Sequence, residues 1–245
     1  MISAVVLTKN EENNIIKCLA SLNWVDEIIV IDDFSVDLTI NRIQKLKNKR
    51  IKIYKRRLND DFAGQRNYGL SKAKDDWILF LDADETLSKF LSKEILLKTK
   101  NTKYDGFYIK RRDYFLGHEM KHGEVGDIKL LRLGRKNSGK WERKVHEYWN
   151  IKGESQGLHN FIIHSKNQSL NQFISKIDKY SEIHAKELKA EGKRSNLLRI
   201  IIWPTGKFIY NYFFKLGFLD GVEGFILATI MSFHSFLAWT KLWIS

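Results

Sequence analysis

Apolar runs and helix-like segments alternate over the first hundred residues of the chain. Four apolar runs have the length and composition of strands, at 2–7, 27–31, 51–54 and 77–81. Three stretches between them carry apolar side chains at helical spacing, at 12–22, 40–46 and 62–73. Short apolar strands separated by helices of about ten residues are typical of a parallel sheet covered on both faces. The pattern predicts an α/β fold with a mostly parallel sheet.

The pattern changes twice further along the chain. From 104 to 163, strand-like segments alternate with glycines and charged loops. After 168 the chain turns helical, and its last fifty residues are rich in aliphatic and aromatic side chains. We therefore expect one domain over 1–165 and a helical extension over 166–245.

The net charge of the chain limits the classes of partner that it is expected to bind. Its 245 residues include 42 Lys and Arg against 29 Asp and Glu, a formal net charge of +13. This excess favours an anionic partner, which is nucleic acid, an acidic membrane face or a phosphorylated small molecule. The lone cysteine, Cys18, excludes an internal disulfide framework and Cys-rich zinc sites, and is most simply a core residue. The first apolar run is too short for a signal peptide, so we expect a reducing, cytosol-facing protein.

Polar side chains follow three of the predicted strands at the point where each strand ends. Residues 8–11 follow the first strand, Asp32 and Asp33 the second, and 82–84 the fourth. In open α/β sheets, ligands bind beyond the carboxyl ends of the strands. Asp and Asn also favour turns and helix caps. Three such clusters at one sheet edge nevertheless indicate a ligand site better than any one of them.

The chemistry of these side chains suits a nucleotide. Asp82 and Asp84, one residue apart after a buried strand, can hold a hard divalent cation beside a diphosphate. A buried carboxylate such as Asp33 can accept the imino hydrogen of uracil, which would reject cytosine. Arg66 offers a forked cation suited to phosphate oxygens, unless it is a solvated helix arginine.

Four segments occur in the order and at the spacing of family 2 glycosyltransferases, at 4–11, 30–37, 63–69 and 79–84. The chain resembles this family strongly over residues 2–100. Towards the C-terminus it is more weakly similar to bacterial lipopolysaccharide-core beta-1,4-glucosyltransferases. The resemblance implies a GT-A-like nucleotide-binding domain that uses a sugar nucleotide and Mg²⁺ or Mn²⁺. It makes 1–100 the sugar-nucleotide half and 101–165 the acceptor half of the catalytic domain.

The resemblance also implies roles for single residues. Binding of the nucleotide sugar is expected of six residues: Thr8, Glu11, Asp32, Asp33, Arg66 and Asp82. Among these, Asp33 would sit against the base with Asp32 as its neighbour, and Arg66 would reach the phosphates. Asp84 would be the direct metal ligand, with Asp82 near the ribose and the metal.

An inverting sugar transfer also needs a base that takes the proton of the acceptor hydroxyl. The triplet at 145–147 resembles a motif of this subgroup at this distance from the Asp-x-Asp. The resemblance implies that Glu147 is the base and that His146 positions the acceptor or leaving group. The usual family pattern here is an acidic pair, and a strand-end polar pair is the alternative.

Three further histidines are candidates for metal binding. His164 follows the apolar run 161–163 and would complete the metal shell, or is structural. His118 and His122 lie in a Gly-containing loop with Glu119 and Glu124. For that loop we favour an acceptor-side role over a second, two-histidine metal site.

The basic, aromatic C-terminus suggests a membrane surface. The uninterrupted apolar part of 218–239 falls short of the roughly 20 residues that a spanning helix needs, and Asp220 and Glu223 make spanning costlier. Lys and Arg around Trp203 and Tyr210 suit a helix in the headgroup region of an anionic leaflet. A helical cap on the catalytic domain is the alternative. By resemblance, the lipid acceptor grows on the inner membrane, so we expect peripheral attachment to its cytoplasmic face.

These observations predict an inverting, metal-dependent glycosyltransferase. It would move a hexose, glucose from UDP-glucose, to a lipid-linked saccharide in lipopolysaccharide core biosynthesis. One alternative is a nucleotidyltransferase, although residues 8–11 lack the glycines of its first loop. Another is a non-catalytic, membrane-bound nucleotide-binding scaffold. We expect no nucleic-acid partner, because the sequence has no signature of a nucleic-acid-binding fold and its aromatic residues form long apolar stretches.

Overall fold

The computed structural model of the full chain describes residues 1–126, 128–144, 147–165 and 170–245. The chain divides into two compact units. We call residues 1–111 and 128–165 the sheet unit, and residues 112–127 and 166–245 the helical unit. The segment 112–127, which we placed within 1–165 on sequence grounds, groups with the helical unit.

The first half of the sheet unit is a parallel sheet. Its strands, in spatial order, are β3 (Ile51–Lys55), β2 (Glu27–Asp32), β1 (Ile2–Thr8) and β4 (Trp77–Asp82). The helices between them are α1 (Ile15–Ala20), α2 (Thr39–Lys45) and α3 (Phe62–Lys72). Every residue of β2 is buried, which is why its sequence is apolar on both faces. This half matches the predicted α/β pattern.

The second half of the sheet is antiparallel, so the expectation of a mostly parallel sheet is only partly right. Beyond β4 the sheet continues through β8 (Ile128–Arg135), β6 (Gly106–Phe115), β11 (Ser155–Ser165) and β5 (Glu85–Leu87). Strand β8 is antiparallel to both β4 and β6, and β5 is antiparallel to β11. The strands β6 and β11 alternate buried and exposed residues over part of their length, as expected where one face meets solvent.

Three smaller elements complete the sheet unit. Helix α4 (Lys89–Lys98) is capped by Ser88, whose hydroxyl accepts the amide of Leu91 at 3.1 Å. Strands β9 (Gly139–Glu142) and β10 (Tyr148–Ile151) form a separate two-stranded ribbon. The ribbon delivers Trp141 and Trp149 against Phe80 of β4, with ring centroids 5.0 and 5.1 Å away.

Apolar side chains fill both faces of the sheet. Val5 and Val6 are both fully buried, and because they are successive strand residues they point to opposite faces. Cys18 is buried on the face that holds Val6, which confirms it as a core residue. Burial raises the pKa of its thiol well above the usual value. Gly69 lets α3 approach β1 closely, since an added Cβ would lie 2.4 Å from Val5 Cγ1.

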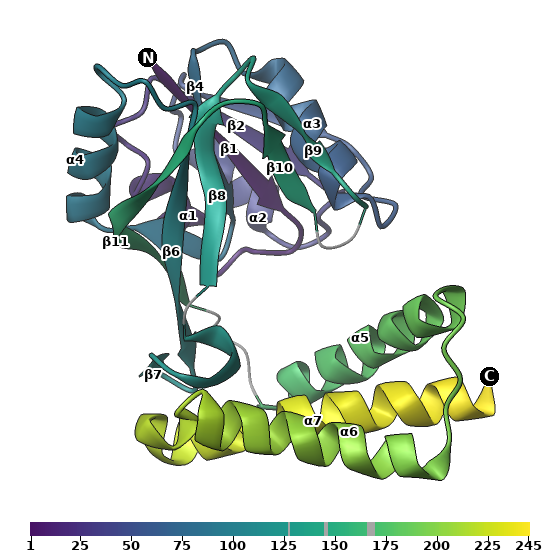
Figure 1. The fold of residues 1–245 in the computed structure, drawn as a ribbon. Helices are drawn as coiled ribbons and strands as arrows, with labels where there is room; N and C mark the ends of the chain where they lie inside the picture. Colours follow the sequence, from purple (N-terminus) through teal and green to yellow (C-terminus); the bar gives the residue numbers. More distant parts are fainter. Residues whose placement is uncertain (127, 145–146, 166–169) are drawn as a thin grey trace. The chain divides into compact units, whose positions relative to one another are not determined.

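The helical unit is built around two long helices that pack on each other, α5 (Leu170–Ala190) and α7 (Gly221–Ile244), with α6 (Leu197–Ile209) beside α7 (Figure 1). Between α6 and α7 run the π-helical turn η2 (Tyr210–Phe214) and the 3-10 turn η3 (Gly217–Asp220). The strand β7 (His118–Met120) and the turn η1 (Gly123–Val125) also belong to this unit. By length and composition, the segment Gly217–Ile244 is apolar enough to cross a membrane, alone among the described residues.

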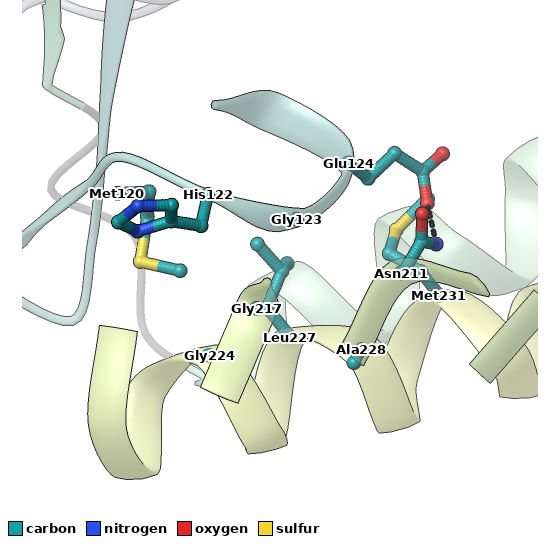
Figure 2. A pocket seen from close by; sticks show the side chains of 10 residues that line it. All are labelled: Met120, His122, Gly123, Glu124, Asn211, Gly217, Gly224, Leu227, Ala228 and Met231. Carbon is teal, nitrogen blue, oxygen red and sulfur yellow. Dashed lines mark hydrogen bonds between the residues drawn. The ribbon is translucent and has the colours of Figure 1, made fainter. Parts of the chain in front are cut away.

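A buried carboxylate ties the loop after β7 to η3. Asp220 accepts the amides of Lys121 and His122 at 3.0 and 2.8 Å and lies 2.8 Å from Nδ1 of His122. Figure 2 shows the small cavity beside this contact, where Asn211 donates to Glu124 at 2.9 Å. His122 therefore contacts a carboxylate of η3. The described residues contain no group of three side chains suited to a metal ion.

Candidate active site

The strand register brings three of the predicted polar clusters to one edge of the sheet. Thr8 pairs with Asp32 on one side of β1, and the preceding Leu7 pairs with Asp82 on the other. Asp33 continues the edge, its amide donating to the carbonyl of Thr8 at 3.0 Å. Because neighbouring strands lie about 4.8 Å apart, the backbones of Asp32 and Asp82 are separated by roughly 10 Å. That span suits a ligand lying across the ends of three strands.

Asp32 and Asp33 have different surroundings. Asp32 is fully buried and accepts the hydroxyl of Ser35 at 2.6 Å, so it holds the turn that follows β2. Asp33 receives Nζ of Lys9 at 2.6 Å and the amide of Leu58 at 3.0 Å. Lys9 is 58% exposed in its side chain, so it can move away from Asp33 at little cost. Asp33 is the better placed of the two to meet a ligand.

Thr8 and Glu11 line the same edge. The hydroxyl of Thr8 is buried and has no hydrogen-bond partner among the described residues. A buried hydroxyl left without a partner costs free energy, which a ligand can recover. Glu11 is half-buried, and its carboxylate accepts a hydrogen bond from the side-chain amide of Asn14 at 2.7 Å.

Arg66 joins two carboxylates that are distant in sequence. Its Nη2 donates to Asp82 and its Nε to Glu147, each at 3.0 Å. The guanidinium also stacks on Trp141, 4.8 Å from the ring centroid. Arg66 is only 3% exposed, so the alternative of a solvated helix arginine is wrong. Its Nη1 is buried without a partner among the described residues.

Arg132 is a second buried arginine that the sequence did not single out. It comes from β8, is 5% exposed, and its Nη2 donates to the other oxygen of Asp82 at 2.9 Å. The same Nη2 lies 3.6 Å from Oε1 of Glu85. Like Arg66, it keeps a buried Nη1 that lacks a partner within the described part of the chain. Two buried guanidinium groups with unused donors are suited to binding an anion.

The two arginines fix the charge of Asp82. Burial alone would raise the pKa of Asp82, but the charges of Arg132 and Arg66 outweigh it and hold the pKa well below its usual range. A third of the Asp82 side chain is exposed, so the arginine pairs matter more than burial. Asp82 is therefore ionised at neutral pH. Because of Asp82 and Glu85, the pKa of Arg132 stays above its usual value although burial opposes this.

Glu85 directly follows the Asp-x-Asp segment in the chain. It is fully buried, and its Oε2 accepts the amide of Asp82 at 2.9 Å. Burial raises the pKa of Glu85, Arg132 opposes the rise and Asp82 adds to it, so the pKa stays above its usual value. Glu85 thus positions both the backbone of Asp82 and, through Arg132, its side chain.

Asp84 and His164 form the remaining pair. Strand β5 aligns with β11 so that His164 is opposite Glu85, and Nε2 of His164 lies 3.3 Å from Oδ2 of Asp84. Both side chains are largely buried. A carboxylate and an imidazole are donors that Mn²⁺ accepts, and a carboxylate suits Mg²⁺. Such ions are commonly held by one or two protein groups plus substrate phosphates, so this pair fits a cation shared with a diphosphate.

The structure thus brings together Asp82, Arg66 and Glu147 through direct contacts, and Asp84 with His164 through another. His146, the second expected acceptor-side residue, lies outside the described residues. Glu147 is described, with 17% of its side chain exposed.

Comparison with known proteins identifies the class. The model of glycosyl transferase family 2 matches residues 3–150, and the chain belongs to this family. The relatives include a lipopolysaccharide core biosynthesis glycosyltransferase, LpsC, of Rhizobium meliloti, 29% identical over 99% of this chain and 92% of the relative. An uncharacterised glycosyltransferase of Rickettsia conorii is 29% identical over 98% of this chain and 89% of its own length.

Solved structures show the same fold. The Staphylococcus aureus protein TarS, residues 1–349 in complex with UDP-GlcNAc, aligns with a TM-score of 0.52 at 17% identity. The alignment covers 96% of this chain and 81% of that one. The same protein in complex with UDP aligns equally well over 98% of this chain and 88% of the other. At this identity the likeness shows a GT-A-like fold, as the sequence predicted.

Proposed function

We propose that this glycosyltransferase moves a hexose, glucose from UDP-glucose, with inversion onto a lipid-linked saccharide of the lipopolysaccharide core. The observation that carries the proposal is the contact of Arg66 with both Asp82 and Glu147. It joins the strand edge suited to a nucleotide to the carboxylate suited to an acceptor. The name of the Rhizobium meliloti relative supports the pathway, and the UDP-GlcNAc and UDP complexes of TarS support a UDP-sugar donor.

The donor would lie across the three strand ends. Asp33, nearly buried, would accept the imino hydrogen of uracil in place of the hydrogen bond from Lys9. Thr8, Glu11 and Asp32 would border the nucleoside. The Nη1 groups of Arg66 and Arg132, which have no partner among the described residues, would donate to phosphate oxygens.

Asp84 and His164 would hold Mg²⁺ or Mn²⁺, with Asp82 close by. When bound, the cation supplies positive charge that stabilises the departing diphosphate. Both oxygens of Asp82 already face arginines, so we assign Asp84 as the direct carboxylate ligand.

Glu147 would act as the base. It would take the proton of the acceptor hydroxyl as that oxygen bonds to the anomeric carbon, while the bond from this carbon to the phosphate oxygen breaks and UDP leaves. Attack opposite the leaving group inverts the configuration. His146 is proposed to position the acceptor or leaving group.

A lipid-linked acceptor places the enzyme at an anionic membrane surface, and we propose the cytoplasmic face of the inner membrane. The helical unit, with its basic and aromatic residues, would attach it there.

A donor screen tests the proposal. The full chain is incubated with UDP-, GDP- and CMP-sugars and either cation, and the released nucleotide is measured. We expect release of UDP from UDP-glucose, and Asp84→Ala should abolish it with the fold unchanged by circular dichroism. Full activity of Asp84→Ala would reject the metal role. Release of pyrophosphate would favour a nucleotidyltransferase, and absence of cation-dependent UDP binding by calorimetry would favour a scaffold.

A further inference from the structure

One face of helix α6 is apolar and exposed. Six of the exposed positions of α6, namely 197, 198, 201, 202, 205 and 209, recur at spacings of three and four and therefore lie on one side of the helix. All but Thr205 are aliphatic: Leu197, Leu198, Ile201, Ile202 and Ile209. Pro204, three residues after Ile201 and therefore next to this side, is buried, and its carbonyl accepts the hydroxyl of Ser232 of α7 at 2.7 Å. The stripe therefore lies beside the packed side of α6 and stays exposed.

Helix α7 carries a matching stripe. Its exposed large side chains recur at helical spacing on one side: Val222, Phe225, Phe233, Phe236 and Trp243. The other side packs on α5, through Trp239 and Leu242 against Ala185 and Leu188. A helix that crosses a bilayer alone is apolar all round, whereas one side of α7 is covered by protein.

The two stripes share one side of an antiparallel hairpin. Phe208 of α6 meets Phe225 near the start of α7, and Ser195 before α6 donates to the carbonyl of Trp239 near its end. Viewed along each helix from its N-terminus, the stripe lies on the same rotational side of the residues that contact the other helix. Because the helices run in opposite directions, this places both stripes on one side. We call this surface the hairpin face.

The turn between the helices also exposes large apolar side chains, and we count it with the hairpin face. Its exposed large residues are Phe213, Phe214, Leu216, Phe218 and Leu219. Phe214 is 76% exposed, close to the exposure of a free side chain. Isolated apolar residues are ordinary on a protein surface, but a contiguous face of this kind marks an interaction site.

The charged residues of α6 and of the segments next to it are basic, although Lys193 pairs with Glu191 and Lys207 with Glu124. Residues 192–219 contain five Lys or Arg and no Asp or Glu. Lys193, Arg194 and Arg199 stand at one end of α6, and Lys215 at the other, where its Nζ lies over the ring of Tyr210. Aromatic residues with neighbouring cations are typical of the headgroup level of an anionic bilayer.

We propose that the hairpin face docks in the plane of a bilayer containing anionic phospholipid, with α6, the turn and one side of α7 sunk to the level of the headgroups. The helices lie on the bilayer and do not cross it. The inference rests on the lipid-linked acceptor of the proposed function, and it assigns the contact to the paired stripes of α6 and α7. The basic residues at both ends of α6 hold the phosphate headgroups.

Vesicle flotation of the full chain tests the proposal without donor or acceptor, so its failure is separate from that of the transferase. Vesicles of three parts phosphatidylethanolamine to one part phosphatidylglycerol should carry the wild-type chain, and phosphatidylcholine vesicles should carry less. Ile202→Glu and Phe214→Glu should each lower binding about tenfold or more, because they place a charge in the apolar face. Phe90→Glu is the matched control, since Phe90 is 73% exposed on α4 of the sheet unit. It should bind as wild type.

Three outcomes would overturn the proposal. In the first, Ile202→Glu floats as well as Phe90→Glu. In the second, the bound wild-type chain resists alkaline extraction, which would mean that α7 spans the bilayer. The chain could also fail to float while sedimenting as a dimer that Ile202→Glu dissociates, which would mean that a second copy covers the face. Circular dichroism checks that the variants fold, and Ile202→Ser replaces Ile202→Glu if the latter does not. UDP release with a soluble acceptor should be unchanged in Ile202→Glu and in Ile202→Ser.

Discussion

The two units depart from ordinary protein surfaces and interiors in opposite ways. The sheet unit buries charge, with Arg66, Arg132 and Glu85 each less than a tenth exposed around Asp82. The helical unit exposes apolar side chains, among them Ile202 at 60% and Phe214 at 76%. Buried charges and exposed apolar faces both cost free energy unless something satisfies them. Each departure fits the ligand that we propose for its unit: an anion in one and a lipid surface in the other.

The largest effect is expected from removing the charge of Glu147. Glu147→Gln should lower the rate of transfer by about 10²–10⁴-fold, because an amide cannot take the acceptor proton. The rate is measured as UDP release at saturating donor and acceptor. Glu142→Gln is the control, since Glu142 is an exposed-edge residue that bonds Tyr148 and Asn150 outside the cluster. Equal rates for the two variants would remove Glu147 from the base role.

The next largest effect is expected on the free energy of unfolding, when the buried cation of Arg132 is removed from beside Asp82 and Glu85. Arg132→Met should lower the free energy of unfolding by about 3–5 kcal/mol, because Asp82 and Glu85 then lose their buried cation. Urea unfolding followed by circular dichroism gives the value. Arg135→Met, on the same strand but 41% exposed in its side chain, should cost less than about 1 kcal/mol. If both cost the same, Arg132 does not balance the cluster.

The helical unit has its own titratable pair, and its effect is smaller. His184 and His234 stack with ring centroids 5.4 Å apart, and burial lowers the pKa of both below 6.5. The unfolded chain then binds protons more readily than the folded one. Stability is complete above pH 6.5 and is lost as the pH falls through the folded values. Urea midpoints at about pH 7.5 and about pH 5.5 measure this loss, which His184→Phe should reduce and His159→Asn should not.

The smallest expected effect is on the free energy of unfolding when an exposed residue of the hairpin face is replaced. Ile202→Ser should change the free energy of unfolding by less than about 0.5 kcal/mol, because its side chain packs little in the fold. Leu227→Ala, at a buried position of α7, should cost about 2–5 kcal/mol. Thermal or urea unfolding of the two variants decides. A large loss for Ile202→Ser would show that the stripe serves the fold itself.

The parallel half of the sheet could be predicted because its strands are buried on both faces and read as continuous apolar runs. The antiparallel half could not, since pairing of β8 with β4 and β6 depends on register between distant segments. The grouping of 112–127 with the helical unit could not be predicted for the same reason, because it depends on contacts between distant segments such as that of His122 with Asp220.

Most of the candidate site followed from polar residues at strand ends, because those positions converge in any parallel sheet. Arg132 and Glu85 were missed for different reasons. Arg132 is one of three basic residues of β8, and only its burial and its contact with Asp82 distinguish it. Glu85 directly follows Asp84, and that proximity was the signal that could have found it. Membrane docking was predicted from composition, whereas the shared side of the stripes needed the packing of α6 on α7.

The bridge made by Arg66 implies an order of events. One guanidinium serves both Asp82 and Glu147, so a diphosphate that draws it away releases Glu147 from a cation. In the proposed reaction, Glu147 can meet the acceptor hydroxyl only once its hydrogen bond from Arg66 is broken. Ordered kinetics, with the sugar nucleotide entering first, are the natural consequence of this shared side chain.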